Sequence, residues 1–87
     1  MTFEQHSELI AIYKEVFPTE RFFADVHSAA KENGFHFVMR ILRQTRAVSA
    51  LLGWEKASYG LFEAIMLGEI QTKLLDEDGE EDAKPDH

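Results

Sequence analysis

The histidines and carboxylates are the residues with which this chain could bind a metal ion or transfer protons. The four histidines, at positions 6, 27, 36 and 87, include no pair at i+3 or i+4 spacing, and the chain has no cysteine and no HExxH motif. The acidic run after residue 75 lacks the spacing of an EF-hand loop. Nucleophile elbows, P-loops and dinucleotide-binding glycine motifs are also missing. We therefore expect no enzyme activity, no metal site, no cofactor and no small-molecule substrate.

The charge of the chain is concentrated at its C-terminal end. The 87 residues contain 9 Lys+Arg and 16 Asp+Glu, a formal net charge of −7. Seven of those acids and one lysine lie in residues 76–87, so this segment has a net charge of −6 and the rest of the chain a net charge of only −1. A segment so acidic and so poor in apolar residues cannot bury a core. We expect a disordered acidic tail at 76–87, following one helical domain at 2–75.

Four helices are predicted within that domain, which makes the fold class all-α, a small helical bundle. The capping-box pattern Thr2-x-x-Gln5 starts the first helix, and Pro18 stops it after Phe17. The second helix spans 19–33 and ends at Gly34. The third spans 35–52. Because apolar residues alternate at 35–41, a short strand is an alternative prediction for that segment. We expect its apolar face to carry residues 37, 38, 41, 48 and 52.

The fourth predicted helix, at about 54–75, is apolar over more than half of its circumference. So small a chain cannot easily bury all of that surface, which favours a partner protein or a homodimer. Some of these residues must pack in the core, but an exposed tryptophan beside such a helix is typical of an interface centre. The candidate interface residues are Trp54, Tyr59, Phe62, Met66 and Ile70.

Residues 45–62 have the skeleton of a helix-turn-helix corner, with Val48 and Leu52 expected to pack inward and Gly53 to make the turn. The stretch Val48-x-x-Leu51-Leu52-Gly53, followed by Tyr59 and by Gly68-Glu69-Ile70, resembles small prophage excisionase-type helix-turn-helix domains. The resemblance covers about a quarter of the chain and implies a DNA-binding regulator.

A basic stripe on the third helix is the second feature that could contact nucleic acid. Segment 33–62 holds four bases and one acid, a local charge of +3. Arginines there could contact phosphates, while few exposed positions of the corner carry side chains suited to base edges. The candidate nucleic-acid contacts are Arg40, Arg43, Arg46, Lys56 and Ser58. The alternatives are a solvated helix face, or a stripe covered by the acidic tail folding back.

Two functions follow from these patterns. The first is a small interaction protein, a regulator or inhibitor that binds a partner protein or a second copy of itself. The second is a helix-turn-helix DNA-binding protein, in which nucleic acid is the partner.

The chain shows no basic–apolar signal sequence and no apolar run of the roughly 20 residues that span a bilayer. We therefore expect a cytoplasmic protein without a membrane partner.

Overall fold

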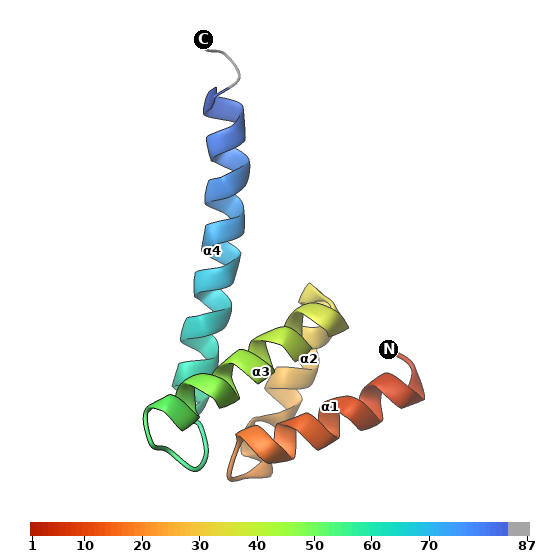
Figure 1. The fold of residues 1–87 in the computed structure, drawn as a ribbon. Helices are drawn as coiled ribbons and strands as arrows, with labels where there is room; N and C mark the ends of the chain where they lie inside the picture. Colours follow the sequence, from red (N-terminus) through yellow and green to blue (C-terminus); the bar gives the residue numbers. More distant parts are fainter. Residues whose placement is uncertain (84–87) are drawn as a thin grey trace.

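The all-α prediction is confirmed. The computed structural model describes the backbone of residues 1–83 and the side chains of residues 1–75, and it contains no strand among them. The long helices are α1 (Phe3–Val16), α2 (Phe23–Asn33), α3 (Phe35–Leu51) and α4 (Tyr59–Ala83), and the short 3-10 helix η1 (Glu20–Phe22) precedes α2. Figure 1 shows α1, α2 and α3 forming a packed body from which α4 rises. Residues 35–41 are helical, which excludes the short strand left open by the sequence.

The helix boundaries follow from local capping. The Thr2 hydroxyl accepts a hydrogen bond from the Gln5 N–H at 3.0 Å, and the Gln5 side chain accepts one from the Thr2 N–H at 3.2 Å, so the predicted capping box is present. Pro18 follows α1, as predicted. Gly34 separates α2 from α3 with φ at 103°, a backbone conformation that strongly favours glycine. Gly68, by contrast, lies within the uninterrupted α4.

Helix α3 is the centre of the body, because it packs against α1, α2 and α4. The core gathers around it, with Leu9, Val26, Ile41 and Phe62 fully buried. The predicted inward face of α3 was only partly right, since Leu52 is 53% exposed. The buried face is rotated toward residues 42, 45 and 49, because α3 has neighbours on several sides. It therefore includes Thr45, whose hydroxyl donates to the Ile41 carbonyl at 2.7 Å.

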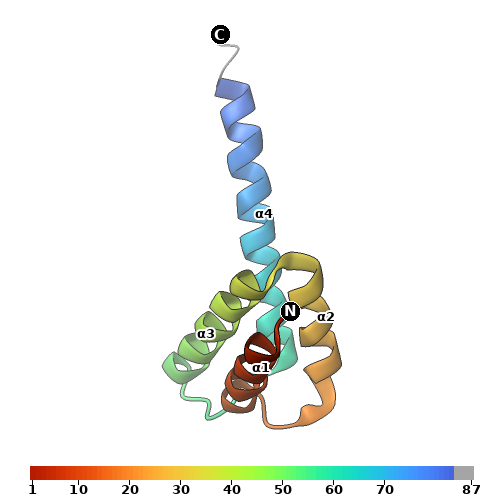
Figure 2. The ribbon, with the colours of Figure 1, turned by 90° about the vertical axis from the view of Figure 1, so that its right-hand side faces the viewer.

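Helix α4 starts five residues later than predicted and continues further. Its backbone is helical from Tyr59 to Ala83, so it includes residues 76–83 of the expected acidic tail, while 84–87 lie outside the described residues. Figures 1 and 2 show its C-terminal half projecting beyond the other helices. The segment extends as a tail, and through residue 83 it does not fold back over the basic stripe of α3.

Candidate protein-interaction surface

The connection between α3 and α4, residues 52–58, is built as a Schellman motif. Gly53 adopts φ of 80°, and its N–H donates to the Ala50 carbonyl at 3.0 Å. The Trp54 N–H then reaches back to the Ser49 carbonyl at 2.8 Å. These two bonds satisfy carbonyls that the end of α3 would otherwise leave unpaired. The chain is thus held in one conformation where it leaves the helix.

Contacts with α1 fix the remainder of this connection. The Ala57 N–H donates to the Val16 carbonyl at 2.8 Å, and Ala57 itself is buried. The Lys56 ammonium donates to the Lys14 and Glu15 carbonyls at 2.9 and 3.1 Å, which places a positive charge at the C-terminal end of α1. Ser58 then caps α4, because its hydroxyl accepts the Leu61 N–H at 3.2 Å. Hydrogen bonds to α1, to the end of α3 and to the start of α4 therefore anchor the loop.

Three large apolar side chains are exposed at this corner. Leu51 is 86% exposed, Leu52 53% and Trp54 47%. We call these three residues the corner patch, and Figure 1 shows their loop at the end of the body away from the N-terminus. A rigid backbone that presents a tryptophan and two leucines to solvent is suited to filling an apolar pocket on another protein. The sequence indicated Trp54, whereas Leu51 and Leu52 emerge from the geometry of the turn.

The other predicted interface residues lie on the face of α4 that packs against the body. Phe62 is fully buried, with its ring edge-on to Phe17 at 5.9 Å between centroids, so its assignment to a partner interface was wrong. Tyr59 stacks on Phe22 at 4.8 Å, and Met66 packs against the same core. Ile70 is half-buried beside Phe37. The prediction failed for Phe62 because periodicity identifies an apolar face but not which surface covers it.

Intramolecular contacts already engage four of the five candidate nucleic-acid residues. Arg40 pairs with Glu69 at 3.1 Å, and Arg46 pairs with Glu15. Lys56 and Ser58 make the capping contacts described above. Arg43 is exposed, and no ion pair to it is found within the part of the chain whose side chains are described. The structure therefore leaves Arg43 most readily available to a phosphate, although exposed ion pairs such as those of Arg40 and Arg46 are individually weak.

The fold brings together two histidines that the sequence spacing did not connect. His6 of α1 and His27 of α2 lie with ring centroids 5.2 Å apart, and Phe23 flanks both rings. Burial, reinforced by the charge of His6, lowers the pKa of His27 below its ordinary value of 6.5. No group of three or more potential metal ligands is found among the described residues. The two rings therefore form an aromatic contact between α1 and α2, with no third potential ligand beside them among the described residues.

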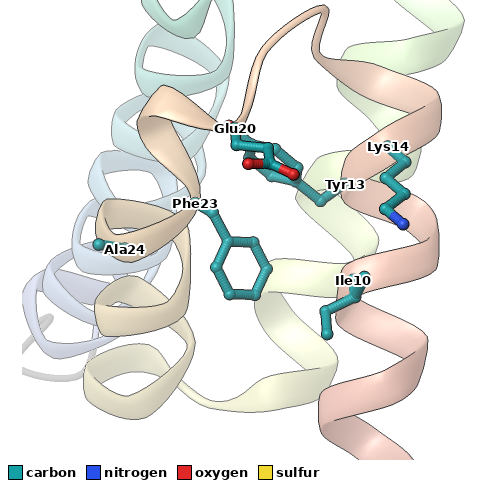
Figure 3. A pocket seen from close by; sticks show the side chains of 6 residues that line it. All are labelled: Ile10, Tyr13, Lys14, Glu20, Phe23 and Ala24. Atoms are coloured by element: carbon teal, nitrogen blue, oxygen red, sulfur yellow. The ribbon is translucent and has the colours of Figure 1, made fainter.

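A hollow of about 460 Å³ lies between α1 and the η1–α2 segment, and Figure 3 shows the side chains that line it. Ile10 and Phe23 face each other across it, with Lys14 and Glu20 nearby. The Tyr13 hydroxyl, its most distinctive polar group, donates to the Thr19 carbonyl at 2.7 Å and accepts the Phe22 N–H at 3.0 Å. That hydroxyl is thus already satisfied within the chain, which leaves Lys14 and Glu20 as the charged groups that line the hollow.

Comparisons with family models, with curated proteins and with solved structures found no match to this chain. The resemblance to excisionase-type domains thus stays a prediction. Its structural counterpart, the α3–α4 corner, has a connection of seven residues, whereas a helix-turn-helix turn has about three or four. Within residues 1–83, no helix combines the length and the apolar character that crossing a bilayer requires.

Proposed function

We propose that this protein is a non-catalytic interaction module that regulates or inhibits a partner protein by occupying an apolar pocket on it. The observation that carries the proposal is the corner patch, which exposes Leu51 at the end of α3 and Leu52 and Trp54 on the hydrogen-bonded loop that follows it. Tryptophan is among the residues most enriched at the energetic centres of interfaces. Here three large apolar side chains are exposed within four consecutive residues, and exposed apolar surface of this kind commonly marks an interaction site.

The rigidity of the corner strengthens this proposal in energetic terms. Association costs free energy for every loop and side chain that must be ordered on binding. Here the backbone of residues 52–58 is ordered before binding, by Gly53, by the Ala57–Val16 hydrogen bond and by Lys56. Binding through these apolar side chains therefore costs less free energy for ordering the loop.

Affinity capture from host extract, with matched variants, tests the proposal. The double substitution Leu51→Ser and Leu52→Ser removes much of the corner patch without touching the core, because both side chains are exposed. Phe3→Ser is the control, since it removes an 83% exposed phenyl group at the start of α1. We expect the wild type and the control to retain the same partner at equal yield, and the double variant to lose it. Equal retention by all three proteins would refute the proposal.

DNA binding is the second candidate function, and exposed Arg43 on the outer side of α3 is the observation that favours it. It predicts a duplex mobility shift at about 50 mM salt that weakens steeply as salt rises. The shift should disappear in Arg43→Glu and increase in a chain that ends at Leu75, because that chain lacks the −6 of residues 76–87. Absence of any shift from either the full or the shortened chain would eliminate this candidate.

A further inference from the structure

Two histidines from different helices lie close enough together to share one metal ion. His6 of α1 and His27 of α2 are far apart in the chain, yet their ring centroids are 5.2 Å apart. Two imidazoles on one tetrahedral ion would have ring centres about 5.2 Å apart, given a Zn–N bond of about 2.05 Å, a nitrogen about 1.15 Å from its ring centre and an angle of about 109°. The fold therefore already sets the spacing that a two-histidine site requires.

Packing around the pair keeps the two rings near each other. Helices α1 and α2 each pack on α3, so the backbone positions of both histidines are fixed by the body of the protein. Both residues are half-buried, which restricts their side chains and still leaves them in contact with solvent. Phe23 flanks the pair, with its ring centroid 6.0 Å from each imidazole. Binding then requires only that each imidazole turn about χ2, a soft torsion in histidine, to direct a nitrogen at the ion.

The protonation state and the chemistry of the pair determine which ion fits. A metal binds the neutral imidazole, and the lowered pKa of His27 keeps that ring neutral at pH 7. Burial lowers this pKa most, followed by the charges of His6, Lys31 and the N-terminal ammonium. Imidazole nitrogen suits Zn²⁺, Cu²⁺ and Ni²⁺, whereas Mg²⁺ and Ca²⁺ prefer oxygen ligands. The positive charges of Lys31 and the ammonium oppose a bound cation, so we expect exchangeable binding.

We infer that His6 and His27 form a binding site for a divalent transition-metal ion such as Zn²⁺, with water in the remaining coordination positions. The described residues provide no third ligand, so the protein contributes these two. The ion links α1 to α2 and stabilises the folded chain, because the unfolded chain does not hold the two rings together. Spacing in the chain did not reveal this site, since the two histidines are not i+3 or i+4 neighbours. The pair is separate from the corner patch, so the inference does not depend on the proposed function.

Thermal unfolding of the full chain, with Zn²⁺ and with a chelator, tests the site. Zn²⁺ at ten times its Kd should shift the folding equilibrium about tenfold toward the folded chain, which raises the Tm by several degrees. His6→Gln and His27→Gln should each remove this rise in Tm, whereas His36→Gln, at an exposed position of α3, should keep it. Mg²⁺ should have no effect. Because each variant is compared with itself, with and without Zn²⁺, a change in its own stability does not affect the result.

Equilibrium dialysis against Zn²⁺ measures how many ions the pair binds. We expect the wild type to bind one more Zn²⁺ per chain than either His6→Gln or His27→Gln. Zn²⁺ bound equally by the wild type and both variants, for example at the acids of residues 76–87, would overturn the inference. A difference of one ion per two chains would also overturn it, because the ion would then be shared between two copies. So would a wild-type Tm that Zn²⁺ does not raise.

Discussion

Replacing Gly53 by alanine tests the idea that the Schellman motif holds the corner in place. Gly53 has φ of 80°, and a Cβ atom there would have no neighbour within 4 Å. The cost of the substitution is therefore backbone strain without a steric clash, about 1–2 kcal/mol for an L-residue in the left-handed region. Alanine also restricts the unfolded chain, which returns about 0.4–1 kcal/mol. The expected net loss is about 1 kcal/mol, or a Tm lower by roughly 4–8 °C in a domain of this size.

Thermal unfolding followed by circular dichroism at 222 nm measures this loss. Gly68→Ala is the matched control, because Gly68 lies inside α4 and an added Cβ atom there also meets nothing. It should raise stability by about 1 kcal/mol, the difference in helix propensity between glycine and alanine. Opposite shifts of the two variants support the reasoning. A Gly53→Ala protein as stable as the wild type would refute it.

Three further predictions concern the body of the protein. Thr2→Ala removes the hydroxyl that accepts the Gln5 N–H, and it should lower the urea midpoint by the equivalent of about 1 kcal/mol. Because the pKa of His27 is lowered in the folded state, the unfolded chain binds more protons at mildly acid pH, and the stability contributed by His27 is lost as pH falls below about 6.5. The urea midpoint should therefore be lower at mildly acid pH than at neutral pH, and His27→Gln should make the difference between the two midpoints smaller. Phe62→Ala, at a fully buried position, should cost about 3–5 kcal/mol and leave the domain largely unfolded, whereas an interface residue would show no such loss.

Local signals predicted much of the fold. Thr2 and Gln5 form the expected capping box, Pro18 follows α1, and Gly34 and Gly53 end their helices with positive φ values. These features depend on residues close together in the chain, which is why a single sequence is sufficient to predict them. The start of α4 was missed, because residues 54–58 are held by long-range bonds from Ala57 and Lys56 to α1. No local pattern contains such contacts.

The candidate site was harder to predict than the fold. The sequence shows that α4 has more apolar surface than one face, but periodicity does not indicate which face packs against the other helices. Phe62 is therefore in the core, while Leu67 and Leu75 are exposed on the other side. Likewise, the partners of Arg40 and Arg46 are glutamates on other helices, at positions 69 and 15. Sequence alone predicts that such residues share a face, and only the packed structure shows what each face contacts.

The most direct test of the interaction-module proposal is the affinity of the captured partner for the wild type and for Trp54→Ala. Trp54 is the only tryptophan in the chain and is 47% exposed at the corner. If it anchors the interface, its truncation should cost at least about 2 kcal/mol, or roughly thirtyfold in Kd, while Phe3→Ala leaves Kd unchanged. Equal Kd values for the wild type and Trp54→Ala would contradict the proposal that the corner is the binding surface.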